Sequence, residues 1–305
     1  MREAQIEAAL ADPDAPAEAT VGAAGIPFHV LSWGDPRSEP VVLVHGVTSS
    51  ARTWWRVGPA LAAAGYRVLA PDLPGHGLTG SWRGQQRFRD NAAGLAALLR
   101  EALPDRKPND VRVVGHSWGG MTVAALPSAG YVPFRLVLLD PPAIPRDVLA
   151  QMLEDPVERR YDDIAEAREV IGRHNPTWAY GDVVAKAEGL TQYDEAAVRA
   201  ILLENGDWDG GLAALDDPAA RGVPISLIRG DPQFGGYVPD ALVAAFEARL
   251  GPDRVTTIVG APHSPQRTHA AETTQAILRA LRGRSKPLRL QLDRDPVLDA
   301  LDPGS

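Results

Sequence analysis

The sequence has no cysteine among its 305 residues. This absence excludes disulfide bonds, thiolate metal sites and a cysteine nucleophile. Positive charge is also scarce: 31 Lys and Arg stand against 39 Asp and Glu, a net charge of −8. A nucleic-acid partner is therefore not expected, because binding to phosphates needs clustered cations. No apolar run approaches the roughly 18 residues of a membrane span, so we expect a cytoplasmic protein without a membrane partner.

The two ends of the chain have the composition of segments outside a core. Residues 1–20 are rich in Ala, Pro and acidic side chains and lack the apolar stretch of a signal peptide. We expect them to form a mobile N-terminal arm, in which one short helix is an alternative. Residues 284–305 mix Arg, Lys, Asp and Pro and are expected to form a loose C-terminal tail.

Between these ends, short apolar strands alternate with helical stretches. Val41–Val44 and Val111–Val114 are β-branched runs, typical of strands that are buried on both faces of a parallel sheet. The alternation predicts an α/β fold with a mostly parallel central sheet and helices on both faces. The expected strands are 28–33, 41–44, 67–70, 111–114, 135–139, 223–229 and 255–259. The expected helices are 53–64, 88–103, 117–126, 240–250 and 265–282.

The alternation breaks in the middle of the chain. Residues 144–217 contain no convincing strand, and helical character appears at 146–154, 158–173, 177–189 and 194–204. The simplest interpretation is a helical cap, residues 145–217, inserted between two strands of one sheet. Residues 21–144 and 218–283 then form the core.

One motif carries a specific chemistry. The sequence G-H-S-W-G at 115–119 fits the pattern G-x-S-x-G. It follows the expected strand 111–114 and opens the expected helix 117–126, which is the context of a nucleophile elbow. In such a turn the serine hydroxyl is exposed above the sheet, so Ser117 is predicted to be a nucleophile.

Three further stretches support one family. They are V-H-G at 44–46, P-D-L-P-G-H-G at 71–77 and A-P-H-S-P at 261–265. With the elbow, they give residues 21–283 a sequence that resembles the α/β-hydrolase superfamily, in particular a capped serine hydrolase of the esterase or lipase type. The matches follow the order of that family, in which the nucleophile comes first and the catalytic histidine last.

The resemblance implies roles for individual residues. Ser117 would attack the substrate, and His263 would accept its proton. The backbone N–H groups of Val47 and Trp118 would form the oxyanion hole. The resemblance implies no cofactor, and the sequence has no H-E-x-x-H motif that would indicate a metal site.

The acid that orients the histidine has two candidates. Asp231 follows the penultimate strand, the commoner position in the family, and Asp140 follows the strand after the nucleophile helix. The usual carboxylate position, about three residues after the loop glycine, is occupied by Gln233. Asp231-Pro232 nevertheless matches the frequent Asp-Pro of that loop if two residues are deleted before it. Asp231 is the predicted acid, with Asp140 as the alternative.

The substrate is the least defined part of the prediction. His45, Trp54, Trp55 and Trp178 are expected to line a pocket for a small apolar or aromatic acyl group, and packing in the core is the alternative for the tryptophans.

The predicted reaction is hydrolysis of a carboxylic ester, lactone or thioester through an acyl-enzyme. A carbon–carbon bond hydrolase or an amidase with the same triad is the alternative, and a binding protein that kept the fold is a third. Epoxide hydrolases and haloalkane dehalogenases are disfavoured, since they use a carboxylate where Ser117 stands.

Overall fold

The computed structural model describes residues 2–82 and 84–282. Within them, one sheet has eight strands in the order β1-β2-β4-β3-β5-β6-β9-β10. The neighbours β1/β2 and β2/β4 are antiparallel, and the other neighbouring pairs are parallel. The strands are β1 (Ala17–Ala23), β2 (Ile26–Trp33), β3 (Glu39–Val44), β4 (Tyr66–Pro71), β5 (Arg112–His116), β6 (Arg135–Leu139), β9 (Ile225–Arg229) and β10 (Val255–Thr257). The predicted mostly parallel sheet is confirmed.

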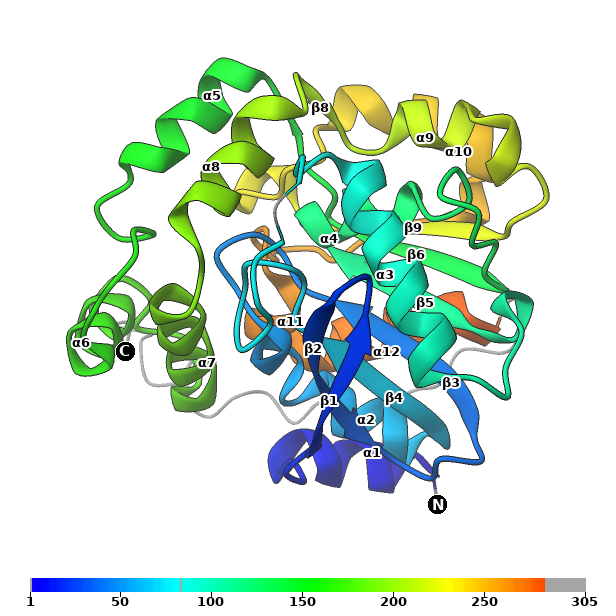
Figure 1. Ribbon diagram of the computed structural model, residues 1–305, viewed down its shortest axis with the longest axis horizontal. Coiled ribbons are helices and arrows are strands. Elements are labelled where there is room, and N and C mark those ends of the chain that lie inside the picture. The colour runs from blue at the N-terminus through cyan, green and yellow to red at the C-terminus, as the bar shows by residue number, and fades with distance from the viewer. Residues whose placement is uncertain (1, 83, 283–305) are drawn as a thin grey trace, which may run out of the picture.

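Helices cover both faces of this sheet (Figure 1). In β3, Val42 and Val44 belong to one apolar cluster, while Val41 and Leu43 belong to another on the opposite face. This alternation explains the continuous β-branched run, because successive side chains of a strand point to opposite faces. One face carries α1 (Arg2–Ala11), α2 (Val57–Ala63) and α12 (Ala270–Arg282); the other carries α3 (Phe88–Ala102), α4 (Trp118–Ala124) and α10 (Val243–Leu250).

The N-terminal segment differs from the expected mobile arm. Residues 2–11 form α1, which packs against α2 with the side chain of Ile6 fully buried. Residues 17–23 form β1, which pairs with β2 over its whole length. A short helix was the alternative for this segment, whereas the strand was not expected. Ile6, Ala9 and Leu10 pack against the core, and pairing at the edge of the sheet holds β1 in place. The predicted tail, 284–305, lies outside the described residues.

The insertion between β6 and β9 is helical. It contains α5 (Arg146–Gln151), α6 (Ile164–His174), α7 (Tyr180–Thr191), α8 (Glu195–Glu204) and α9 (Leu212–Asp216). Because β6 and β9 are neighbours in the sheet, the insertion leaves the sheet uninterrupted and lies beside it (Figure 1). The expectation that residues 144–217 contain no strand was wrong at the base of the insertion. Two short strands, β7 (Ala143–Ile144) and β8 (Trp208–Asp209), pair at the base of the insertion.

Three helices predicted for the core are divided in the structure. The helix expected at 240–250 is a 3₁₀ turn, Asp240–Leu242, followed by α10. The helix expected at 265–282 is split at His269 into α11 (Pro265–Thr268) and α12. The helix expected at 53–64 is a 3₁₀ turn, Ala51–Trp54, followed by α2. No helix in the described part of the chain combines the length and the apolarity needed to cross a bilayer.

Candidate active site

Ser117 stands at a sharp turn between β5 and α4. Its φ of 56° and ψ of −129° lie outside the regions that non-glycine residues prefer, and strain of this kind is typical of a nucleophile elbow. The flanking glycines are required by close approach of backbones. A Cβ at Gly115 would lie 2.3 Å from the Gly119 carbonyl oxygen, and one at Gly119 would lie 2.4 Å from that of His45.

A hydrogen-bonded chain of three side chains begins at this serine. Nε2 of His263 lies 2.9 Å from the Ser117 Oγ, and Nδ1 of His263 lies 2.6 Å from Oδ2 of Asp140. Because the carboxylate can only accept, Nδ1 carries the proton and Nε2 accepts from the serine hydroxyl. The ring of Tyr237 stacks on the imidazole at 3.9 Å between centroids, which fixes the plane of the histidine.

The carboxylate that bonds His263 in this series of hydrogen bonds belongs to Asp140 and not to the predicted Asp231. Asp140 follows β6, is fully buried and also accepts from the N–H groups of Gly230 and Tyr237, each at 2.9 Å. The carboxylate of Asp231 instead accepts from the N–H groups of Gln233 and Gly260, each at 3.0 Å.

The shape of the loop after β9 explains this correction. Asp231 is the N-cap of the 3₁₀ turn Pro232–Phe234, so its side chain bonds with its own turn and with the loop that leads to the histidine. Those backbone hydrogen bonds, first the one from Gly260, lower the pKa of Asp231. In the described part of the chain, Asp231 makes no hydrogen bond with His263.

His116 supports the histidine loop from within the elbow. Its Nε2–H donates to the backbone carbonyl of His263 at 2.8 Å, and its Nδ1 faces the Gln266 side-chain amide at 3.3 Å. Burial lowers the pKa of His116 well below the ordinary value, so the ring stays neutral and keeps one donor and one acceptor. Sequence reasoning placed His116 in the elbow but found no role for it, because its partners are about 150 positions away.

The two predicted oxyanion donors flank the nucleophile. Val47 follows Gly46, where an added Cβ would come within 2.9 Å of the Ser117 Cβ, so this loop is in close contact with the serine. Trp118 is the first residue of α4. In the described residues, neither backbone N–H donates to a protein acceptor. Both remain available to an oxygen bound at Ser117.

A cavity of about 410 Å³ opens above Ser117 between core and cap. Trp178 lines it as predicted, but His45, Trp54 and Trp55 are not among the described lining residues. His45 is fully buried, with Nδ1 bonded to the Gly46 carbonyl and Nε2 to the N–H of Leu73. Trp54 is buried in the core, and the Trp55 indole donates to Asp182 at 2.9 Å. These three pocket predictions were wrong.

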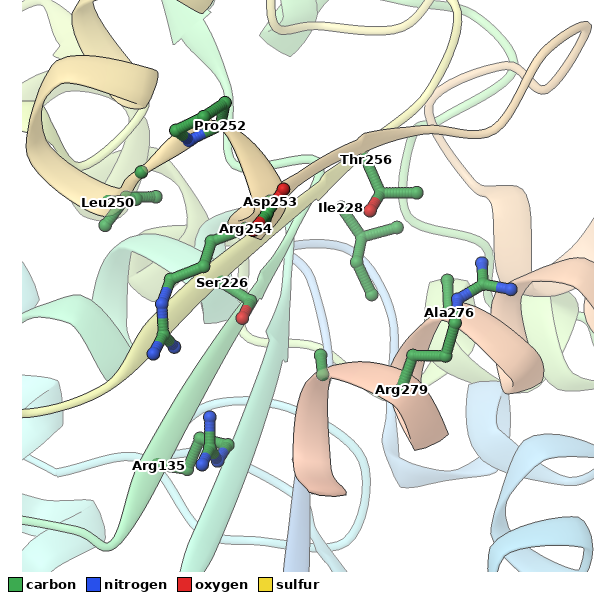
Figure 2. Close-up of a pocket in the computed structure, with 12 residues that line it drawn as sticks. Arg135, Ser226, Ile228, Leu250, Pro252, Asp253, Arg254, Thr256, Ala276 and Arg279 are labelled. Atoms are coloured by element: carbon green, nitrogen blue, oxygen red, sulfur yellow. The ribbon is translucent and has the colours of Figure 1, made fainter. Parts of the chain in front are cut away.

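A second cavity, of about 400 Å³, lies at the opposite edge of the sheet. Figure 2 shows three arginines around it, Arg135, Arg254 and Arg279, together with Ser226. Arg135 begins β6 and Arg254 precedes β10, so this cavity lies near the amino ends of parallel strands. Its described lining contains no histidine. Ser117 and His263 line the first cavity instead, at the carboxyl ends of the strands. Ligands bind at this end in open α/β sheets, so the first cavity is the candidate substrate site.

Comparison with known proteins identifies the family. Residues 41–276 match the α/β hydrolase family. The chain belongs to this family. It is 34% identical over 249 residues to lipase LipV of Mycobacterium tuberculosis, which covers 75% of this chain and 87% of the lipase. It is 38% identical over 134 residues to epoxide hydrolase A of the same organism, which covers 43% of this chain and 41% of that enzyme.

Solved structures show the same fold. This α/β hydrolase superposes on E-2-(acetamidomethylene)succinate hydrolase with a TM-score of 0.73 and 22% sequence identity, covering 88% of this chain and 100% of that one. The thioesterase domain from the curacin biosynthetic pathway superposes with a TM-score of 0.67 and 23% identity, covering 87% and 99% of the two chains. At these identities the likeness concerns the fold alone.

Two acidic and two basic side chains are among the residues that line this cavity, namely Asp155, Glu158, Lys186 and Arg267. Lys186, from α7, donates to the backbone carbonyl and to the hydroxyl of Thr48, both at 3.0 Å, and forms an ion pair with Glu158. Arg267, from α11, donates to the backbone carbonyl of Asp182 at 2.9 Å. Burial lowers the pKa of both cations. Sequence reasoning did not single out either residue.

Proposed function

We propose that this α/β hydrolase is a serine hydrolase that cleaves carboxylic esters without a cofactor, using Ser117, His263 and Asp140. The observation that carries the proposal is the 2.9 Å contact between the Ser117 hydroxyl and His263, whose other nitrogen bonds a fully buried carboxylate. A serine hydroxyl needs such a base to become nucleophilic at neutral pH, and the base needs a fixed tautomer.

The reaction follows from this geometry in two halves. The Ser117 Oγ attacks the ester carbonyl carbon while Nε2 of His263 takes the hydroxyl proton. The carbonyl oxygen gains a negative charge, which the N–H groups of Val47 and Trp118 stabilise. The intermediate collapses, the C–O bond to the alcohol breaks, and His263 protonates the leaving alcohol. Water then attacks the acyl-enzyme and gives its proton to His263. The bond between the acyl carbon and the Ser117 Oγ breaks, His263 returns the proton to that oxygen, and the acid is released.

Two features favour an ester over the other bonds that such a triad can cleave. Lipase LipV is similar over most of both chains, and a lipase is an ester hydrolase. Epoxide hydrolases A and B of the same organism are also similar, over 43% and 72% of this chain, but the elbow here carries Ser117 where epoxide hydrolases carry a carboxylate. Amide and carbon–carbon bond hydrolysis would use the same three residues, but no described contact favours them.

The test is covalent labelling with a fluorophosphonate probe, which reacts with activated serines. We expect one labelled site in the native protein and none in Ser117→Ala, with a loss of kcat on a 4-nitrophenyl ester of about 10³- to 10⁶-fold. Ser226→Ala is the matched control, because Ser226 lies in the second cavity and is also buried. Labelling of Ser117→Ala, or near-native turnover by it, would refute the proposal.

A further inference from the structure

Two cations are buried in the wall of the cavity above Ser117. The exposed fraction is 4% for Arg267 and 6% for Lys186, and both line the same cavity as Ser117 and His263. A buried charge is costly unless an opposite charge or several hydrogen bonds compensate it. The partners of each cation therefore indicate whether it is held for the structure or for a ligand.

Lys186 is compensated within the protein. Its ammonium group forms an ion pair with Glu158 and two hydrogen bonds with Thr48. These three acceptors match the three donors of a lysine. Lys186 thus joins the cap to the oxyanion loop and needs no ligand to satisfy it.

Arg267 is compensated much less. It bonds the backbone carbonyl of Asp182 and makes a long contact, 3.4 Å, with the hydroxyl of Ser49. The Asp182 carboxylate itself is bound by Arg56 and by the indole of Trp55. Among the described residues, no carboxylate lies within ion-pair distance of the Arg267 guanidinium.

An aromatic ring holds the guanidinium of Arg267 in position. Its carbon lies 4.7 Å from the centre of the Trp178 ring, an arrangement in which a planar cation stacks on an aromatic face. Arg267 and Trp178 both line the cavity. The charges of Asp182 and Glu158 act on this guanidinium from beyond ion-pair distance, and neither carboxylate bonds it. A guanidinium that is fixed in this way matches a planar carboxylate, which it can bind through two parallel hydrogen bonds.

The acidic side chains of the cavity do not neutralise Arg267. Glu158 is paired with Lys186, and its side chain is 37% exposed. Asp155 accepts from the backbone N–H groups of Val157 and Glu158 at 2.8 and 3.2 Å. Both acids belong to the cap, and both are more exposed than the two cations. The Glu158 carboxylate therefore balances Lys186, and the charge of Arg267 is the one that no acidic side chain in the described lining of the cavity pairs with.

We propose that the substrate carries a carboxylate, which Arg267 binds while the ester carbonyl lies at Ser117. The inference rests on the proposed function, since it names the substrate class of the same site. It replaces the expected apolar or aromatic acyl group with an anionic one. The acyl donor is then the monoester of a dicarboxylic acid or an ester of similar chemistry, and hydrolysis releases the dicarboxylate and the alcohol.

The experiment compares two substrates that differ in one charge. They are 4-nitrophenyl hemiglutarate, which ends in a carboxylate, and 4-nitrophenyl 4-carbamoylbutanoate, in which a neutral amide of the same shape replaces it. We expect the native protein to prefer the anionic ester by about 10- to 100-fold in kcat/KM, the range of a hydrogen bond to a charged group. Arg267→Gln should lose most of this preference, so that its kcat/KM values for the two esters become similar, and Arg267→Lys should keep part of the preference.

The control separates binding from a structural role. Arg267 contacts the cap helix α7, so its loss could simply loosen the cap. Arg56 binds the same helix through the Asp182 carboxylate and also donates to the Arg267 carbonyl, but it is not a lining residue of the cavity. If Arg267 acts only as an anchor for the cap, Arg56→Gln and Arg267→Gln will each lower kcat/KM for the two esters by the same factor. Melting temperatures of both variants check that each protein is folded.

A binding measurement distinguishes failure of this inference from failure of the proposed function. Glutarate should protect Ser117 from the fluorophosphonate probe, glutaramide should not, and Arg267→Gln should abolish the protection. If Ser117 is labelled but glutarate gives no protection and the native protein shows no preference, the anionic substrate is refuted while the serine hydrolase stands. If Ser117 is not labelled and neither ester is cleaved, the proposed function fails and the inference fails with it.

Discussion

Replacing Asp140 by Asn tests the assignment of the acid most directly. The carboxylate accepts three hydrogen bonds, from His263 at 2.6 Å and from the N–H groups of Tyr237 and Gly230 at 2.9 Å. An amide offers one oxygen and one NH₂ group, so at least one of these donors must face another donor. If the NH₂ group faces His263, the imidazole takes the tautomer in which Nε2 carries the proton and cannot accept one from Ser117.

Asp140→Asn should affect both kcat and the free energy of unfolding. The wrong tautomer should lower kcat by about 10⁴-fold, by analogy with the same substitution in a serine protease. The free energy of unfolding should fall by about 2–4 kcal/mol, because charge-assisted hydrogen bonds are lost and one buried donor is left unsatisfied. Stability and catalysis should therefore both suffer, with catalysis affected more.

Asp231→Asn is the matched control. It makes the same chemical change at the end of the neighbouring strand β9, where the side chain is only half-buried. Asn is about as good an N-cap as Asp, so we expect a loss of stability below about 1 kcal/mol and a change in kcat of less than about 3-fold. The assays are ester turnover, the rate of probe labelling at Ser117 and urea denaturation. A severe catalytic loss in Asp231→Asn together with a mild one in Asp140→Asn would refute the assignment.

Three other perturbations test the surroundings of the site. Gly46→Ala should reduce kcat by about 10- to 100-fold with little change in melting temperature, because the new methyl group would crowd the Ser117 side chain. His29→Gln should cost about 1 kcal/mol of stability near pH 5.5 and less near pH 9, measured by urea midpoints. The hydrogen bond to Asp72 raises the pKa of His29, so its contribution is complete below the unfolded value and is lost as the pH rises through the folded one. His76→Phe should flatten the fall in stability between about pH 6.5 and 3 by up to about 1.4 kcal/mol per pH unit, because burial lowers the pKa of His76 to about 3 and the unfolded chain binds the proton first.

The parts of the fold that sequence could predict are those fixed by local pattern. The run at 41–44 is apolar at every position because both faces of β3 are covered, and so it indicated a parallel sheet without any knowledge of its neighbours. The elbow was predictable for a similar reason. Gly115 and Gly119 are required by contacts at fixed spacing from Ser117, and these contacts recur wherever a strand turns sharply into a helix.

The acid was not predictable because two candidates have equivalent local patterns. Asp140 and Asp231 both follow strands that are adjacent in the sheet, so both lie at the carboxyl edge. Which of them reaches His263 depends on how the loop after β9 folds back. There Gly230 and Tyr237 donate to Asp140, and the 3₁₀ turn occupies Asp231. The spacing of residues along the sequence does not determine which aspartate bonds His263.

The tryptophans show a different limit. Trp54 and Trp55 are adjacent, yet one is buried in the core and the other bonds the cap at Asp182. Side chains in a 3₁₀ turn point about 120° apart, so a shift of one residue decides between core and cavity. The positions of the tryptophans in the sequence indicated an apolar pocket, whereas the cavity is lined in part by charged side chains from the cap and α11 that are distant from Ser117 in sequence.

The charge of the cavity has a consequence for the chemical step itself. His263 becomes positively charged when it takes the serine proton, and Arg267 and Lys186 line the same cavity. Their positive charges already act on the neighbouring ring of His116, where they contribute to its lowered pKa. Without a ligand, Arg267 opposes the developing charge on His263, because like charges repel strongly where water is excluded. A bound carboxylate cancels that repulsion. The anionic ester should therefore show a higher kcat as well as a lower KM. A preference seen in KM alone would place the carboxylate too far from His263 to act on the transition state.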